Sequence, residues 1–385
     1  MSAVSRATSA QETMSNFLAA RALAVAAVTF VAAAGTPRAP VVPLVAGLTV
    51  VTAVSNAPFG DDESVKTVTS TSANDGMTVT ITGNMPSIDS KKTEHVNVTR
   101  HVLAADLKSS HSFKYLFTSG DQLEFAGTTA ITASAAVIAD IRRSGKTEFA
   151  VNGEAQGIGG LVSAVFGAMT SGDASHALSL GPNASGTLKV VEQQPVPFAV
   201  LLNGERVNLQ AWHLKGLLEK GDNPASVECW ILDDPANPLM LRYLIDKQKL
   251  QVVRIDVPTA DNGKAIESAL STEKRAVLYG VYFDYNSADL KPQSATVLKQ
   301  VADIMQREPS WKLRIEGHTD SVGGDAAANK ALSARRAEAV KAALVERGVA
   351  SARLDTQGFG SGSPREANNT LQGRARNRRV ELTRE

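Results

Sequence analysis

The sequence predicts an α+β protein, and three observations lead to this fold class. The chain has 385 residues, which is enough for two or three domains. Polar and β-branched residues alternate within 61–270, as in MTVTIT at 77–82, and such alternation is typical of half-buried strands. From 275 onward, strand-like and helix-like segments alternate instead. The sequence therefore predicts a mainly-β middle region, followed by a βαβαβ-type sheet covered by helices.

The composition excludes several classes of protein. With 40 basic and 39 acidic residues the net charge is +1, whereas a general nucleic-acid-binding protein usually carries a basic excess. Cys229 is the single cysteine, so an intrachain disulfide and a cysteine-based zinc site are both excluded. Because Cys229 lies in an apolar run, it is predicted to be a buried core residue. Its distance from the N-terminus also argues against a lipid-attachment role.

Residues 1–57 are predicted to be a signal peptide or an N-terminal apolar segment. Residues 22–34 carry no charge, follow Arg21 and precede small residues, which is the pattern of a secretory signal. A second apolar run covers 41–54, and each run is shorter than the ~20 residues that span a bilayer. Cleavage could follow Ala34 or Ala57, and a retained inner-membrane anchor is the alternative.

The middle region, 61–270, is predicted to be an antiparallel sandwich or barrel with one helix. A division into two domains near 193–197 is the alternative. The helix covers 130–143 and ends at Gly145. Asn203-Gly204 is a strong hairpin signal between strands at 198–202 and 206–214. Further strands are predicted at 227–232, 239–245 and 250–257. We find no nucleophile–base pair and no metal-ligand spacing here, so the region is interpreted as a scaffold or a partner-binding surface.

The C-terminal region, 275–385, contains the predicted α/β elements. The predicted strands cover 275–283, 311–316, 354–358 and 379–382. One predicted helix begins near Lys291-Pro292, a second covers 325–347 and a third covers 372–377. Proline is well tolerated in the first turn of a helix, and Gly348 marks the end of the long helix.

Four motifs in this region occur in a specific order. They are VYFDYNS at 281–287, GHTD at 317–320, LSARRA at 332–337 and NRRV at 377–380. In this order they resemble the OmpA C-terminal-like domain, the peptidoglycan-binding module of outer-membrane protein A, Pal and MotB. The resemblance covers about 278–382 and implies a cell-wall-binding protein of a Gram-negative bacterium.

The resemblance also implies a site for meso-diaminopimelate in the stem peptide of peptidoglycan. The side-chain end of this amino acid carries an ammonium and a carboxylate on one carbon, which suits an acid placed near a guanidinium. Asp320 matches the family's ammonium-binding aspartate, and Arg336 matches its carboxylate-binding arginine. The remaining predicted peptidoglycan-binding residues are Asn286, Asn329, Arg378 and Thr319.

Structural interpretations remain open for the same residues. Asp320 could cap the loop or the following helix, and Arg378 could brace the last strand. Arg336 could be a solvated helix arginine beside Arg335, which has Glu338 at helical pairing distance. His318 and Asp320 lack a third ligand at metal-binding spacing.

One departure from the family's pattern affects the predicted Asn329. The chain holds one residue more than usual between Asp320 and Asn329, and Ala328 replaces an aromatic residue. The Gly323-Gly324 pair gives this loop the freedom to absorb the extra residue.

The predicted function is non-covalent binding of peptidoglycan without enzymatic turnover. No cofactor and no metal are expected, and the protein is expected to be exported to the periplasm or the outer-membrane side of the cell wall. Other envelope proteins are possible partners of the β-rich region. Two alternatives remain: a wall-anchoring component of a secretion or motor assembly, and a wall hydrolase targeted by this domain. Whether the N-terminal segment is cleaved or retained helps to separate these classes.

Overall fold

The computed structural model describes ten segments of the chain. They are 40–55, 62–86, 93–114, 120–152, 184–219, 224–245, 248–259, 262–284, 286–322 and 324–385. Residues 40–385 belong to one compact unit. The predicted signal region up to residue 39 lies outside the described residues. Among the described residues, no helix combines the length and the apolar character needed to cross a bilayer.

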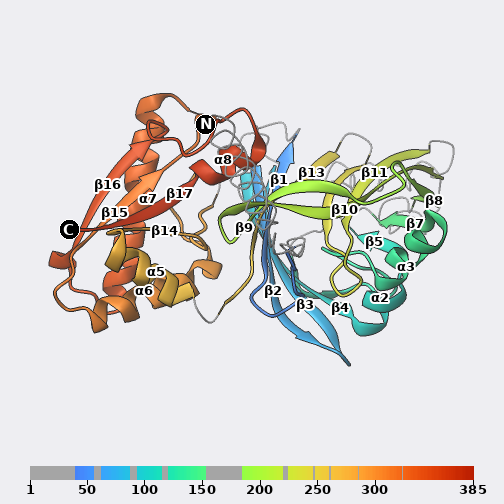
Figure 1. Cartoon of the computed structure of the whole chain (residues 1–385), viewed down its shortest axis with the longest axis horizontal. Helices are drawn as coiled ribbons and strands as arrows, with labels where there is room; N and C mark the ends of the chain where they lie inside the picture. The colour runs from blue at the N-terminus through green and yellow to red at the C-terminus, as the bar shows by residue number, and fades with distance from the viewer. Residues whose placement is uncertain are drawn as a thin grey trace, which may run out of the picture. The chain divides into compact units, whose positions relative to one another are not determined.

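The strands before residue 260 join in one large, mainly antiparallel sheet (Figure 1). They are β1 Thr49–Ser55, β2 Asp62–Ser72, β3 Gly76–Pro86, β4 Thr93–Leu103, β5 Ser112–Lys114, β6 Gly120–Glu124, β7 Lys146–Asn152, β8 Ala184–Val190, β9 Val196–Leu202, β10 Glu205–Leu218, β11 Ala225–Leu232, β12 Met240–Ile245 and β13 Gln248–Asp256. Within the described segments their order is β5-β7-β8-β10-β11-β12-β13-β1-β2-β3-β4-β6, and β9 pairs with both β10 and β13. The sheet is therefore continuous across residues 193–197.

The predicted hairpin is present in this sheet. Strands β9 and β10 pair antiparallel, with Leu202 opposite Glu205. Asn203 and Gly204 both have positive φ, at 47° and 84°, as a tight two-residue hairpin turn requires. Local turn chemistry was sufficient to predict this element.

In the described residues of the β-rich part, helices are formed by α2 Ala104–Ser109 and α3 Ala135–Ser144. The predicted helix at 130–143 begins later than expected. The side chain of Ser134 accepts a hydrogen bond from the Val137 amide at 3.3 Å and caps α3, while Thr132 forms a β-bridge with Leu239. Gly145, with φ 67°, ends the helix as predicted.

Strand β1 comes from the segment predicted to be apolar at 41–54. It pairs with β13 on one side and β2 on the other. Val50 and Val51 are 1% and 2% exposed, so apolar side chains of this run are buried in the folded protein. Whether the chain is cleaved at all stays a prediction.

Cys229 is fully buried in a core formed by strands β5, β7, β8 and β10 to β13 and by helix α3. Burial raises the pKa of its thiol to about 12. The prediction that Cys229 is a core residue is confirmed.

The C-terminal part contains a second sheet, with helices packed on it. Its strands are β14 Arg275–Leu278, β15 Leu313–His318, β16 Leu354–Gly360 and β17 Arg379–Arg384. Its helices are α5 Asn262–Thr272, α6 Ala295–Arg307, α7 Ala326–Glu346 and α8 Leu371–Asn377, with single 3-10 turns at Pro292–Ser294 and Ser351–Arg353. The strand order is β14-β17-β15-β16, and only β15 and β16 run parallel. This mixed sheet with its helices confirms the predicted fold class.

The first strand of this part is shorter than the predicted 275–283. Strand β14 ends at Leu278, and Gly280, with φ 99°, turns the chain out of the sheet. The following residues, 281–284, form an extended loop whose Phe283 bridges to Leu290. This departure is important because the loop lines the candidate site.

Helix α5 precedes the predicted start of the C-terminal domain at 275, yet its Ile266 and Leu270 belong to the C-terminal core. The domain limits stay predictions.

A smaller hydrophobic cluster, called here the bridging cluster, joins strands of the first sheet to the C-terminal part. Its buried members are Val51, Ala53, Val65, Leu201, Val253, Tyr282 and Ala375. Polar contacts surround it: Gln372 donates a hydrogen bond to the Ala199 carbonyl at 3.1 Å, and the Cζ atom of Arg254 lies 4.6 Å from the Tyr282 ring centroid. The β-rich part is thereby packed beside the predicted binding motifs.

Candidate functional site

The GHTD and LSARRA motifs meet because helix α7 packs unusually close to strand β15. A Cβ atom on Gly317 would lie 2.1 Å from the backbone oxygen of Ser333, so only glycine fits here. Ser333 is fully buried, and its hydroxyl accepts a hydrogen bond from the Gly360 amide at 2.8 Å. This packing fixes the register of α7 against the end of β15, where Asp320 follows.

Arg336 projects from α7 and is only 9% exposed. Its Nε donates to the Ser287 carbonyl at 2.8 Å and its Nη2 to the Asp284 carbonyl at 3.4 Å. The described residues offer Arg336 these backbone acceptors and no carboxylate in an ion pair. Burial lowers the pKa of Arg336 to about 10, with nearby Arg378 as the second cause. Arg336 is therefore a buried cation that makes no ion pair with a described carboxylate, although the charges of Glu63 and Asp320 offset part of the lowering of its pKa.

Asp320 is 6% exposed and is bound on both oxygens. Its Oδ1 accepts from the Val322 amide at 2.9 Å, and its Oδ2 accepts from Nη1 of Arg378. The capping residue of α7 is instead Asp325, which accepts from the Ala328 amide at 2.7 Å. The helix-cap interpretation of Asp320 is therefore wrong.

Arg378 follows α8 and links two carboxylates. Its Nη1 binds Asp320, and its Nη2 binds Glu63 of strand β2. Burial alone would lower the pKa of Arg378, yet Glu63 and Asp320 together raise it above its ordinary value. Arg378 therefore stays positively charged between the two carboxylates.

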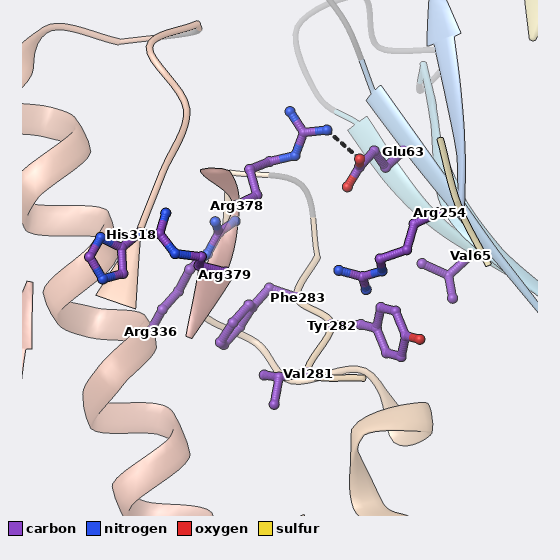
Figure 2. A pocket seen from close by; sticks show the side chains of 10 residues that line it. All are labelled: Glu63, Val65, Arg254, Val281, Tyr282, Phe283, His318, Arg336, Arg378 and Arg379. Carbon is purple, nitrogen blue, oxygen red and sulfur yellow. Dashed lines mark hydrogen bonds and ion pairs between the residues drawn. The ribbon is translucent and has the colours of Figure 1, made fainter. Parts of the chain in front are cut away.

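Arg336 and Arg378 line a cavity of about 50 Å³, which suits a small end group, and Asp320 lies behind Arg378 outside this lining. The residues lining it are Glu63, Val65, Arg254, Val281, Tyr282, Phe283, His318, Arg336, Arg378 and Arg379. Figure 2 shows Glu63 pointing from the first sheet toward Arg378. Arg254 is paired with Asp256 at 3.0 Å and Arg379 with Glu381 at 2.5 Å.

The other predicted site residues are not among those that line this cavity. Thr319 is 4% exposed, and its hydroxyl has no hydrogen-bond partner among the described residues. Asn329 is 6% exposed and donates to the Gly324 carbonyl at 3.1 Å. Asn286 is exposed with φ 49° in the loop before α6. Of the predicted residues, Arg336 and Arg378 thus line the cavity and Asp320 is bound to Arg378.

Arg335 is the matched neighbour of Arg336 and is exposed on the same helix. The predicted alternative paired it with Glu338, but Glu338 accepts a hydrogen bond from the hydroxyl of Thr356. Arg335 and Arg336 therefore differ sharply in environment, and only Arg336 faces the cavity.

Within the described segments, one group of side chains has metal-binding spacing. The candidate ligand atoms of Glu316, His318 and Glu381 lie within 4.8 Å of one another. Both carboxylates are already paired with arginines: Arg275 contacts both, Arg314 contacts Glu316, and Arg365 and Arg379 contact Glu381. Because these guanidiniums already supply the positive charge, a further cation would be repelled.

His318 is 3% exposed, and its ring stacks on Phe359 at a centroid distance of 5.0 Å. Neither ring nitrogen has a hydrogen-bond partner among the described residues. Burial, followed by Arg379, lowers its pKa to about 4. The imidazole is therefore neutral at physiological pH.

Sequence reasoning missed Glu63, Arg254 and Phe283 as pocket residues. Phe283 lies inside the VYFDYNS motif, so its position beside Asp284 was a usable signal. Glu63 and Arg254 carry no local signal, because they reach the pocket only through the packing of the first sheet.

Comparisons with known proteins agree with the motifs. Residues 282–378 match the OmpA family. The C-terminal part of this chain is therefore an OmpA-family domain, as its motifs predicted.

Named relatives match the same part of the chain. "Probable lipoprotein YiaD" of Escherichia coli is 44% identical over 103 residues, which are 27% of this chain and 47% of that protein. "Peptidoglycan-binding protein ArfA" of Mycobacterium tuberculosis is 41% identical over 102 residues, 26% of this chain and 31% of that protein. The chain thus spans less than half the length of these curated relatives. Among solved structures, the crystal structure of the peptidoglycan-associated lipoprotein from Burkholderia pseudomallei matches with 33% sequence identity and a TM-score of 0.26. The match covers 27% of this chain and 88% of the lipoprotein chain.

Proposed function

We propose that this protein binds peptidoglycan non-covalently, by holding the zwitterionic end of meso-diaminopimelate between Arg336 and Asp320. The observation that carries the proposal is the buried guanidinium of Arg336, which donates to two backbone carbonyls and makes no ion pair with a described carboxylate. A buried charge without a partner is costly. A ligand carboxylate would supply the missing charge through charge-assisted hydrogen bonds.

Asp320 is the partner for the ligand's ammonium. It is buried and ionically paired with Arg378, and an ionised carboxylate offers about four lone-pair sites. Two of them are used by Val322 and Arg378, which leaves acceptor capacity for an ammonium. Arg336 lines the cavity, and Asp320 is bound to Arg378, which lines it too. An acid and a guanidinium placed in this way match a group that carries both charges on one carbon.

The relatives support the same class of ligand, since one of them is named a peptidoglycan-binding protein and another a peptidoglycan-associated lipoprotein. We infer that the protein anchors itself to the cell wall of the envelope, without turnover of the wall. Export through the N-terminal segment belongs to this proposal.

The test is sedimentation of the full chain with purified peptidoglycan of the diaminopimelate type and of the lysine type. Asp320→Ala and Arg336→Ala should each weaken binding by about 2–5 kcal/mol, because each leaves a charge of the ligand unpaired. Arg335→Ala is the matched control and should bind normally, since an exposed helix arginine contributes at most about 0.5 kcal/mol. Thermal unfolding of each variant checks that the fold is retained.

Lysine-type peptidoglycan has the ammonium without the adjoining carboxylate, so it should bind weakly. Equal binding to both walls would show that the diaminopimelate end is not the ligand. A larger defect from Arg335→Ala than from Arg336→Ala would also refute the assigned site. Release of soluble fragments from the wall would favour a hydrolase instead.

A further inference from the structure

Glu63 reaches the pocket from strand β2, far from the binding motifs in sequence. Side chains two apart on a strand share a face, so Glu63 lies on the same face as Val65. Val65 is 3% exposed and belongs to the bridging cluster with Tyr282 and Ala375. This packing, together with the hydrogen bond from Gln372 to the Ala199 carbonyl, holds the Glu63 carboxylate against Arg378.

Of the described residues that line the pocket, four are arginines and Glu63 is the acidic one. Arg254 pairs with Asp256, and Arg379 pairs with a carboxylate that two further arginines share. Glu63 therefore supplies the negative charge of the lining itself. Burial alone would raise the pKa of Glu63, but Arg378, Arg254 and Arg336 together lower it, so its carboxylate is charged at neutral pH.

The geometry of Arg378 gives Glu63 a second effect. Its two terminal nitrogens are divided, with Nη1 on Asp320 and Nη2 on Glu63. An arginine and a carboxylate prefer a bidentate pair, in which both nitrogens bind one acid. Without Glu63, Nη2 would be available to close on Asp320, and the acceptor capacity that an ammonium needs would be lost.

We propose that Glu63 is a specificity-determining residue of the site, which restricts it to ligands that carry an ammonium beside a carboxylate. The β-rich part thus contributes directly to recognition. The inference rests on the proposed function, because it concerns the same pocket. With Glu63 removed, the site would lose one negative charge and would favour a simple carboxylate.

The experiment is calorimetric titration of the full chain with two small ligands. One is meso-diaminopimelate, and the other is pimelate, which keeps both carboxylates and lacks both ammoniums. Glu63→Gln should weaken meso-diaminopimelate binding at least tenfold and leave pimelate binding equal or stronger, so the preference between the two ligands falls. Glu205→Gln is the matched control, because Glu205 is exposed and forms a distant 3.8 Å contact with Arg376 outside the pocket.

Each other result overturns the inference. Equal loss for both ligands would show that Glu63 is only structural, and an unchanged preference would show that it has no role in selection. Tighter binding of meso-diaminopimelate by Glu63→Gln would show that Glu63 competes with the ligand. Failure of the unmodified chain to bind meso-diaminopimelate would overturn both the function and the inference. Normal binding with an unaltered preference in Glu63→Gln would overturn the inference alone.

Discussion

The guanidinium of Arg336 lies over the ring of Phe283, with its Cζ atom 4.9 Å from the ring centroid. The ring supports one face of the guanidinium, and the carbonyls of Ser287 and Asp284 hold two of its nitrogens. All three contacts come from the loop that follows β14. This loop therefore orients the arginine and leaves the rest of its hydrogen-bonding capacity for a ligand.

Replacing Phe283 by leucine should weaken wall binding without abolishing it. A cation–π contact contributes about 0.5–2 kcal/mol, so the dissociation constant should rise roughly twofold to thirtyfold. Phe359→Leu is the matched control, because Phe359 is also half-buried and stacks on His318 instead of an arginine. The measurement is sedimentation on diaminopimelate-type peptidoglycan. Equal effects of the two substitutions would show that the Phe283–Arg336 contact is unimportant for binding.

The stability of the protein should depend on pH through His318. Its pKa is about 6.5 when unfolded and about 4 when folded, so the unfolded chain takes up a proton first as the pH falls. The contribution of neutral His318 is therefore complete above pH 6.5 and is lost progressively toward pH 4. For one proton the slope approaches about 1.4 kcal/mol per pH unit.

The measurement is urea unfolding of the unmodified chain and His318→Asn between pH 7.5 and about 5. Asparagine does not titrate, so the difference in free energy of unfolding between the two proteins should shrink as the pH falls. Every other titrating group is common to both proteins and cancels in this difference. A difference that stays constant across this range would contradict the buried, neutral state of His318.

Strand β1 limits how much of the N-terminal segment can be removed without loss of the fold. A chain that begins at residue 35 retains β1, whereas one that begins at residue 58 lacks it. Because β1 lies between β13 and β2, its loss would expose two unpaired strand edges. We expect the longer chain to unfold cooperatively and the shorter chain to aggregate, as measured by circular dichroism and size-exclusion chromatography. A folded, monomeric shorter chain would contradict this expectation.

Most of the C-terminal elements were predictable from local sequence. Helix α7 was expected at 325–347 and covers Ala326–Glu346, because its apolar spacing and Gly348 are local signals. Strand β14 was overestimated, because the apolar residues at 281–283 continue the strand pattern in sequence while Gly280 turns the backbone. In the β-rich part, the Asn203-Gly204 hairpin was predictable, but the partners of β1 were not.

The sequence by itself indicated the family of the C-terminal part and the order of its helices and strands. The helices and strands follow from periodicities whose physical causes are local, whereas Asp320 and Arg336 became candidate ligand contacts through the resemblance of the motifs to the OmpA family. Only the tertiary structure decided that Arg336 makes no ion pair with a described carboxylate and that Arg378 links Asp320 to Glu63. Glu63 and Arg378 are 315 residues apart. Their meeting depends on hydrophobic packing between two sheets, which no local pattern of residues encodes.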